Sequence, residues 1–374
     1  MSVAALNLIQ STDMLLSTLT ANEDTFLVDE GLPAAVPRNV MLIESGILLD
    51  AAAALLLARM WANFDTQELA NGGAVQGDFG NCGGDYFPHT QAHIDMSYPN
   101  KFVKATFPSD GVTLLSMNRP KVNALNDDLW FEIADSCHAA SVDPNCRVVV
   151  LASSLERIYC AGLDLTENGI EHSGEDVGRT AISLKHYIKR LQDAVSAVQL
   201  CQKPVIAAVH GLALGGAIDI ISAADVRYAA EGSVFSIKEV DVGLAADVGS
   251  LQRLPKTTGN ASLLYELALT ARNFDTKEAQ TLGLVSKVVP GGRQGVLDAA
   301  LETAKLIASK SPIAVIGTKH ILNYSREHTV QEGLDYEAVW NMAMLQSEDL
   351  VKAMQAFATK ESPTFSPFYK LAKL

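Results

Sequence analysis

Residues 203–229 read KPVIAAVHGLALGGAIDIISAADVRYA and carry the strongest fold signal in the chain. The run Pro204 to Val209 is short and continuously apolar, which is typical of a strand buried on both faces of a sheet. A glycine-containing turn, His210 to Gly216, follows and leads into an expected helix over residues 216–224. Because a helix N-terminus carries a partial positive charge, this turn could bind a developing oxyanion.

Three carboxylates lie within this stretch or close behind it, in sequence that otherwise indicates buried structure. Asp219 follows the Gly-Gly pair, Glu239 ends a strand-like run, and Asp247 lies in a loop of small residues. A carboxylate in apolar surroundings is costly unless it has a partner or a task, so the set indicates proton-transfer chemistry. Burial and like-charge repulsion should raise the pKa of at least one of them, leaving a protonated acid beside an ionised base.

A second glycine turn, Cys160 to Leu165, comes after another buried strand, Arg147 to Ser153. Glycine permits close approach in such turns because a Cβ atom would block it. Each of the two turns could present a backbone N–H to one oxygen atom, and two converging donors form an oxyanion hole. The sequence Gly-x-Gly-x-x-Gly is absent, which argues against dinucleotide binding.

From residue 102 onward strands alternate with helices, which predicts an α/β architecture with a helical C-terminal part. The further elements that we expect are a strand over 112–117, helices over 125–141 and 180–200, strands over 226–229 and 234–237, and C-terminal helices including 296–310 and 328–357. The strands on either side of residues 231–233 are expected to pair around that turn. Two polar groups receive structural interpretations: His210 as a packed side chain, and Asp225 with Arg227 as an ion pair.

Charge separates the first hundred residues from the rest. The 374-residue chain has a formal net charge of −14, and residues 1–100 hold twelve acidic but only two basic side chains. Because the chain is acidic and has no basic stripe, we do not expect it to bind nucleic acid. The apolar run 40–64 includes three charged residues, so we expect a helix near 42–63 and no membrane span.

The five cysteines are scattered and include no CxxC pair, which favours free thiols in a reducing compartment. Cys82, His89 and His93 are the best candidates for a metal site, but Pro88 argues against a helix there and a fourth ligand is lacking. Zinc sites have tighter paired spacings. The sequence therefore predicts no metal site.

The chain from about residue 102 resembles the crotonase superfamily, also called the enoyl-CoA hydratase/isomerase family. The similar segments are NRPKVNALN (118–126), YCAGLDL (159–165) and residues 203–229. Within that superfamily, KEVDVGLAADVGSLQRLPK (238–256) is similar to the Δ3,5-Δ2,4-dienoyl-CoA isomerases. The resemblance covers about three quarters of the chain.

The resemblance implies a fold and a domain organisation. Residues 102–300 would form a spiral core of ββα units and residues 301–374 a helical region. Residues 1–101 have no counterpart in the resemblance, and we expect them to be an acidic, partly irregular extension of unknown role. It also implies homotrimers or homohexamers and an acyl-CoA substrate. No metal or redox cofactor is implied, because coenzyme A enters as part of the substrate.

The resemblance also assigns roles to individual residues. The N–H groups of Ala161 and Gly216 would hold the thioester oxygen, Asp247 would remove a proton from C2, and Glu239 would deliver one to C6. Asp219 would tune the site. The substrate-binding residues would include Lys121 and Ala124, from the loop near the adenine and pantetheine groups, and Gly162, Leu163 and Asp164 from the first turn. For Asp164, a helix-capping role is an equal alternative.

Two other functions stay open at this point: an enoyl-CoA hydratase, or another acyl-CoA enzyme of this fold, and a non-catalytic scaffold. The retained acids argue against the scaffold.

The chain ends Ala372, Lys373, Leu374, a small-basic-Leu tripeptide similar to the Ser-Lys-Leu peroxisomal address. It predicts binding to the peroxisomal import receptor and a location in the peroxisomal matrix.

Overall fold

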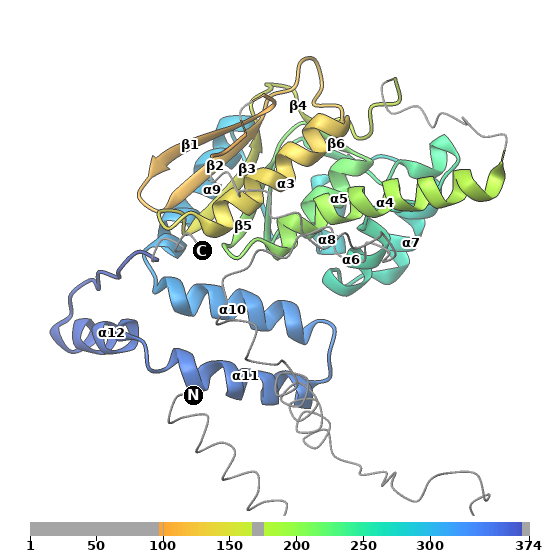
Figure 1. The fold of residues 1–374 in the computed structure, drawn as a ribbon. Coiled ribbons are helices and arrows are strands. Elements are labelled where there is room, and N and C mark those ends of the chain that lie inside the picture. Colours follow the sequence, from red (N-terminus) through yellow and green to blue (C-terminus); the bar gives the residue numbers. More distant parts are fainter. Residues whose placement is uncertain (1–96, 100, 167–175, 369–374) are drawn as a thin grey trace, which may run out of the picture. The chain divides into compact units, whose positions relative to one another are not determined.

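The computed structural model describes residues 97–99, 101–166 and 176–368, which belong to one compact unit (Figure 1). The expected helix near 42–63, the candidate ligands Cys82, His89 and His93, and the C-terminal tripeptide lie outside these residues. Within the described residues, no helix is long and apolar enough to cross a membrane. The same part of the chain contains no group of His, Cys, Asp and Glu that could hold a metal ion.

A six-stranded sheet forms the centre of the fold. Its strands, in spatial order, are β1 (Val103–Ser109), β2 (Val112–Met117), β3 (Val148–Ser153), β5 (Val205–Val209), β7 (Val226–Ala230) and β10 (Lys287–Val289). Only β1 and β2 pair antiparallel, and every other pair is parallel. All residues of β3 and β5 are buried, as their continuously apolar sequences predict.

A second, four-stranded sheet holds the short strands that follow the central ones. Its order is β4 (Ile158–Cys160), β6 (Leu212–Leu214), β8 (Val234–Ser236) and β9 (Phe274–Asp275). The expected pairing of strands 226–229 and 234–237 is therefore wrong. The turn at residues 231–233 carries the chain from the first sheet to the second, so β7 pairs with β5 and β10, whereas β8 pairs with β6 and β9.

Helices cover both faces of the central sheet (Figure 1). On one face lie α3 (Asp127–Val142), α4 (Val177–Leu200) and α5 (Gly216–Ala223), and on the other lies α9 (Gly292–Ala308). Alternate residues of β3 point to opposite faces: Val149 and Leu151 join the core with α3–α5, while Val148 and Val150 pack with α9. The proposed domain boundary at residues 300/301 lies inside α9.

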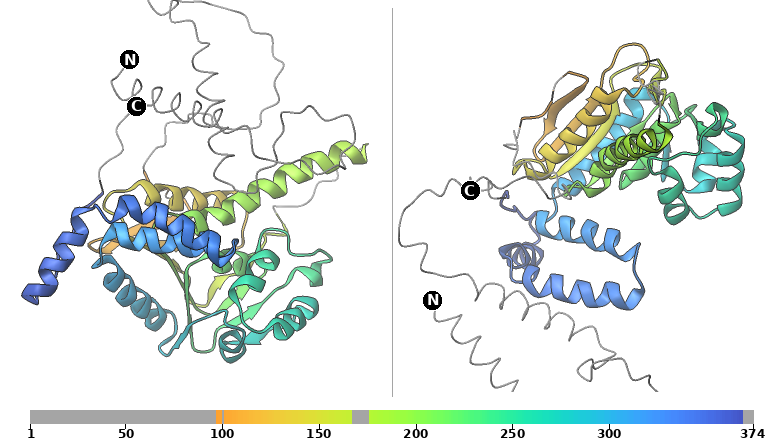
Figure 2. Two further views of the ribbon diagram at one scale, coloured as in Figure 1. Left: turned by 90° about the horizontal axis from the view of Figure 1, so that it is seen from below. Right: turned by 45° about the vertical axis from the view of Figure 1, so that its right-hand side comes forward.

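The remaining helices lie in the second half of the chain. They are the 3-10 helix η2 (Glu239–Val242), α6 (Ser250–Thr257), α7 (Ala261–Thr270), α8 (Thr276–Leu282), α10 (Pro312–Ser325), α11 (Val330–Met344) and α12 (Glu348–Thr359). The single helix expected over 328–357 is two helices, since Ser347 starts α12 after a break. Figure 2 shows α10 and α11 side by side.

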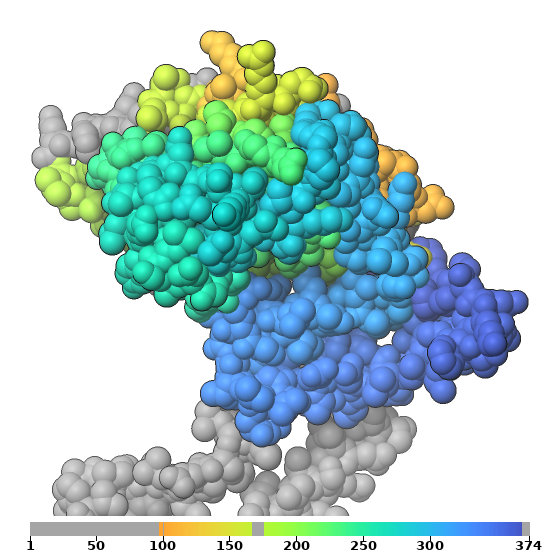
Figure 3. Space-filling view, turned by 180° about the vertical axis from the view of Figure 1, so that it is seen from behind, coloured from red at the N-terminus to blue at the C-terminus, as the bar shows by residue number. Residues whose placement is uncertain are grey.

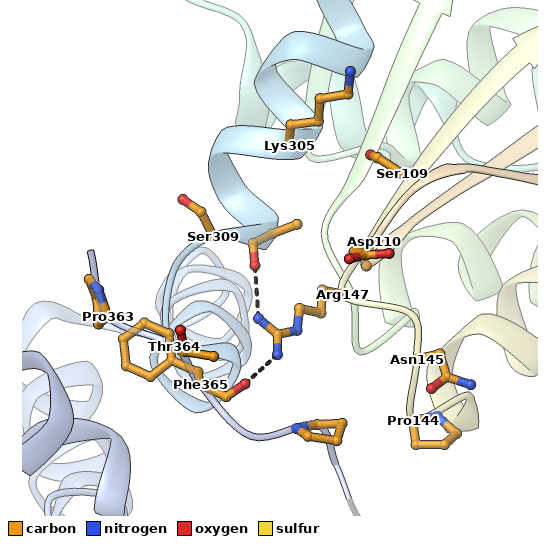
Figure 4. Close-up of a pocket in the computed structure, with 13 residues that line it drawn as sticks. Ser109, Asp110, Pro144, Asn145, Arg147, Lys305, Ser309, Pro363, Thr364 and Phe365 are labelled. Carbon is orange, nitrogen blue, oxygen red and sulfur yellow. Dashed lines mark hydrogen bonds between the residues drawn. The ribbon is translucent and has the colours of Figure 1, made fainter. Parts of the chain in front are cut away.

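Two cationic side chains attach the C-terminal segments to the core. Lys319 of α10 forms an ion pair with Asp225 at 2.7 Å. The predicted ion pair between Asp225 and Arg227 is therefore wrong, and Arg227 instead donates to backbone carbonyl oxygens. Arg147, at the start of β3, donates to the carbonyl oxygens of Ala308 and Phe365 at 3.0 and 2.7 Å beside a cavity of about 640 Å³ (Figure 4).

His210 is packed as predicted, with Nε2 2.6 Å from the Leu155 carbonyl oxygen.

Candidate active site

One cavity of about 130 Å³ brings together both glycine turns and all three candidate carboxylates. Its polar lining includes Asp219, Glu239 and Asp247, and its walls include Trp130, Leu191 and Val248. The arrangement follows from the topology, because β4 and β6 are parallel neighbours whose carboxyl ends meet at one edge of the second sheet. The expected turn His210 to Gly216 contains β6 itself, so the second turn is confined to Gly215 and Gly216 directly after that strand. The first turn directly follows β4, and the two turns therefore lie side by side.

The two turns touch through their glycines. Gly162 has φ +85°, and a Cβ atom on it would lie 2.6 Å from the Leu214 carbonyl oxygen and 3.4 Å from the Gly216 nitrogen. Gly215 has φ +51°, a left-handed conformation that glycine adopts without strain. Any side chain at residue 162 would therefore push the second turn away.

The structure corrects one of the two expected N–H donors. The Ala161 N–H donates to the Val122 carbonyl oxygen at 3.1 Å, so it is already engaged. By contrast, the N–H groups of Leu163 and Gly216, which both line the cavity, have no hydrogen-bond acceptor among the described residues. Leu163, rather than Ala161, is therefore the candidate donor from the first turn. Gly216 is the first residue of α5, where helix N–H groups have no intrahelical partner.

Asp219 is fully buried on α5. Its Oδ1 accepts a hydrogen bond from the Ser250 N–H at 2.6 Å, whereas its Oδ2 is buried without a partner among the described residues. Burial, followed by repulsion from Glu239, raises the pKa of Asp219 to about 7. At neutral pH the neutral acid and the ionised carboxylate of Asp219 are thus present in similar amounts.

Glu239 and Asp247 have different environments in the same cavity. Glu239 begins η2 directly after β8; one of its carboxylate oxygens lies against Gly215, and the other is buried without a partner among the described residues. Asp247 lies in the loop between η2 and α6 and is exposed. Burial is the main cause that raises the pKa of both groups. Part of the Glu239 carboxylate is thus buried inside the cavity, whereas Asp247 is exposed to water.

Asp164 has a supporting position beside the first turn. Its carboxylate is buried, pairs with Arg119 at 2.7 Å and accepts a hydrogen bond from the Thr166 hydroxyl at 2.6 Å. Arg119 also donates to the carbonyl oxygen of Ala124 at 2.9 Å. The ion pair therefore joins the loop 118–126 to the turn that carries Gly162 and Leu163.

Sequence reasoning missed Asn123 as the centre of that loop. It is fully buried with φ +49°, and its side-chain amide donates to the Ser153 hydroxyl and to the Tyr159 carbonyl oxygen, both at 2.9 Å. Asn tolerates the left-handed conformation that this turn needs, so an Asn beside Pro-Lys-Val was the available signal. Lys121 is exposed on the same loop.

Trp130 of α3 was missed as well. It is buried, it lines the cavity, and a Cβ atom on Gly216 would lie 3.2 Å from its ring. The ring therefore packs directly beside the second oxyanion donor. The sequence predicted a helix over this region, but only the tertiary structure shows that Trp130 forms a wall of the cavity.

This arrangement defines an enzyme that stabilises an enolate and moves protons. Two unengaged N–H groups can hold a carbonyl oxygen as negative charge develops on it. Carboxylates in unlike environments can hold and release protons at separate points of the bound molecule. The larger cavity beside Arg147 does not combine these features.

Comparison with known proteins gives the family. Residues 108–367 match the model of the enoyl-CoA hydratase/isomerase family. The chain therefore belongs to the enoyl-CoA hydratase/isomerase, or crotonase, family. This confirms the resemblance and the fold class that the sequence predicted.

Two relatives and one solved structure define the similarity further. The human protein named mitochondrial Delta(3,5)-Delta(2,4)-dienoyl-CoA isomerase is 46% identical over 74% of this chain and 84% of its own. The Arabidopsis thaliana protein named peroxisomal Delta(3,5)-Delta(2,4)-dienoyl-CoA isomerase is 45% identical over 67% of this chain and 91% of its own. The crystal structure of an enoyl-CoA hydratase from Bacillus anthracis has a TM-score of 0.65 at 29% identity, covering 71% of this chain and 99% of that one.

The raised pKa of Asp219 has a measurable effect on stability. Because its folded-state pKa of about 7 exceeds the ordinary 3.8, the folded protein binds the proton more tightly, and stability falls as pH rises between these values. We expect Asp219→Asn to be more stable than the wild type at pH 8, by on the order of 1–4 kcal/mol, and to lose most of this advantage at pH 4.

Chemical denaturation at both pH values measures this difference. Asp298→Asn, which changes an exposed carboxylate on α9, serves as the control and should show no such pH-dependent gain. An equal effect of Asp219→Asn at pH 4 and pH 8 would contradict the raised pKa.

Proposed function

We propose that this protein is an isomerase that converts 3,5-dienoyl-CoA to 2,4-dienoyl-CoA in fatty-acid β-oxidation. The observation that carries the proposal is the third carboxylate, Asp247, in the wall of the cavity that also holds Asp219 and Glu239. The names of the human and Arabidopsis relatives support the same reaction. Substrate and product are isomers, so no redox cofactor is needed, and coenzyme A is part of the substrate.

The proposed reaction begins at C2. The Asp247 carboxylate removes a C2 proton, and the electron pair delocalises over C2 to C6 and the thioester oxygen. The N–H groups of Leu163 and Gly216 hold that oxygen as it becomes an oxyanion. Loss of one such donor typically costs about 3 kcal/mol of transition-state stabilisation.

The reaction ends at C6. Burial raises the pKa of Glu239 above its ordinary value. In the proposed reaction Glu239 is the acid: it gives its proton to C6, and the double bonds then lie between C2 and C3 and between C4 and C5. Asp219 is fully buried and one of its oxygens is held by Ser250. We assign it to tuning the charge of Glu239 rather than to a transfer of its own.

Substrate binding is proposed for the two loops beside the cavity. Lys121 is exposed and cationic, which suits the phosphate groups of coenzyme A. Ala124 and the turn at Gly162 and Leu163 form the approach to the thioester. Asp164 acts on this approach indirectly, since its carboxylate is committed to Arg119.

The direct test is the formation of the conjugated 2,4-dienoyl-CoA from 3,5-dienoyl-CoA, followed by ultraviolet absorbance. We expect Asp247→Asn and Glu239→Gln each to lower kcat by roughly 10²- to 10⁴-fold, the usual contribution of a positioned acid or base. Binding of the CoA ester should change little, because neither substitution alters the shape of the cavity.

Asp298→Asn on α9 is the matched control and should keep full activity. The competing function is an enoyl-CoA hydratase, in which two carboxylates handle a water molecule. Hydration of a 2-enoyl-CoA that is much faster than isomerisation would replace the isomerase proposal. Unchanged isomerisation by both variants would refute the proposed roles of Asp247 and Glu239.

We also propose that the protein is a homotrimer or homohexamer. The C-terminal helices carry large apolar side chains that no described residue covers, and their surface is blue in Figure 3. These are Leu334, Val339 and Met342 on α11, and Leu350, Val351, Met354 and Phe357 on α12. Exposed apolar surface of this kind marks association sites.

Light scattering after size exclusion measures the oligomeric state. The wild type should have three or six times the mass of the chain, and Phe357→Glu, at a side chain that is 88% exposed, should shift the mass toward smaller species. A wild-type protein that is monomeric at micromolar concentration would contradict the proposal.

The proposed location is the peroxisomal matrix, reached through the import receptor that reads Ala372, Lys373 and Leu374. The Arabidopsis relative is named peroxisomal and the human relative mitochondrial, so the relatives alone leave the compartment undecided. Deletion of the three residues should leave a fluorescent fusion in the cytosol. Lys373→Arg, which keeps the basic charge, is the control and should still be imported. Import of the truncated protein would refute this address.

A further inference from the structure

The loop that carries Asp247 is held from behind by one face of α4. Gln192, Ser196 and Gln199 are spaced four and three residues apart, so they lie on the same face of this helix. The Gln192 side-chain amide donates to the carbonyl oxygen of Asp247 itself at 2.7 Å. A side chain outside the cavity thus fixes the backbone of the proposed base.

Arg253 of α6 joins the other two residues of this face to the same loop. Its Nε donates to the Gln199 side-chain oxygen and its Nη2 to the Ser196 hydroxyl, both at 2.9 Å. Its Nη1 lies 3.4 Å from the carbonyl oxygen of Val248, the residue after Asp247. The planar guanidinium therefore connects α4 with the loop in a fixed geometry.

Gly249 shows how closely the loop follows this guanidinium. A Cβ atom at residue 249 would lie 1.6 Å from Arg253 Nη1, and the residue has φ +137°. A side chain there could not coexist with Arg253 in its present place. The next residue, Ser250, donates its N–H to Asp219, so the segment 247–250 connects Arg253 to two of the three carboxylates.

Val248 packs in the apolar core, whereas the back of the loop at Asp247 borders a polar cavity. This cavity of about 300 Å³ is lined by the polar face of α4, by Arg253 and by Asp247 itself. On this side the loop is held by side-chain donors: Gln192 donates to the carbonyl oxygen of Asp247 and Arg253 to that of Val248.

We propose that Gln192 and Arg253 are positioning residues, which act through the loop 247–250 to hold the Asp247 carboxylate at C2 of the acyl chain. The inference rests on the proposed isomerase function, in which Asp247 is the base. Neither residue lines the acyl cavity, so both act through Asp247 and Ser250. A misplacement of a catalytic group by about 1 Å can cost roughly 10²-fold in rate.

The main test compares Gln192→Met with Gln192→Lys. Met keeps the length of the side chain without a donor, whereas Lys restores a donor that can reach the Asp247 carbonyl oxygen. We expect Gln192→Met to lower kcat by about 10- to 100-fold with little change in KM, and Gln192→Lys to recover most of that loss. Equal activity of the wild type and Gln192→Met would overturn the inference.

A partial reaction separates positioning from general loosening of the site. In D₂O, exchange of the C6 proton of 2,4-dienoyl-CoA needs Glu239 and the oxyanion donors but not Asp247. Gln192→Met should therefore exchange at C6 at nearly the wild-type rate while its isomerisation is slow. A parallel loss of both rates would mean that the substitution disturbs the whole cavity, which contradicts the proposed role.

Arg253→Lys gives a second, independent variant, since it keeps the charge but cannot reach Gln199, Ser196 and Val248 together. We expect it to slow isomerisation in the same selective way. The wild type and Asp247→Asn are measured in parallel: absence of isomerisation by the wild type would refute the proposed function, and full activity of Asp247→Asn would refute its role as the base. If Asp247→Asn is inactive while both the Gln192→Met and Arg253→Lys variants are fully active, only the positioning role fails.

Discussion

The close contact between Gly162 and the carbonyl group of Leu214 is the constraint on which the site depends. It exists because β4 and β6 pair in parallel. These two strands can pair because the chain passes from the central sheet to the second sheet after β3 and again after β5. The contact sets the N–H groups of Leu163 and Gly216 beside one cavity. A side chain at residue 162 would separate the two turns, and the proposed oxyanion hole would be lost even with every carboxylate in place.

The three carboxylates differ because their depth differs. Asp219 is fully buried and interacts with Glu239, which raises its pKa to about 7. Asp247, at the other end of the set, is exposed. A buried carboxyl group favours its neutral form and an exposed one its charged form. In the proposed reaction, this difference in depth suits Asp247 to the role of base.

The sequence predicted the central strands, the long helices and the three carboxylates because each depends on local pattern or on residue type. It failed where the answer depends on nonlocal geometry. The turn at residues 231–233 has a sequence suited to a hairpin, yet β8 finds its partner in β6. Ala161 and Leu163 are equally plausible donors by position, and only the acceptor Val122, nearly forty residues away in the chain, takes the first of them.

In the proposed reaction the acid and the base are different residues, so one turnover leaves Asp247 protonated and Glu239 ionised. The site must then be reset. Asp247 is exposed and also lines the polar cavity behind its loop, so it can pass its proton to water without using the acyl cavity. Glu239 is less exposed, and it lies near Asp219, whose pKa of about 7 allows it to be neutral at neutral pH. A neutral Asp219 limits the negative charge in the cavity while Glu239 is ionised, so Asp219 can tune this step without transferring a proton of its own.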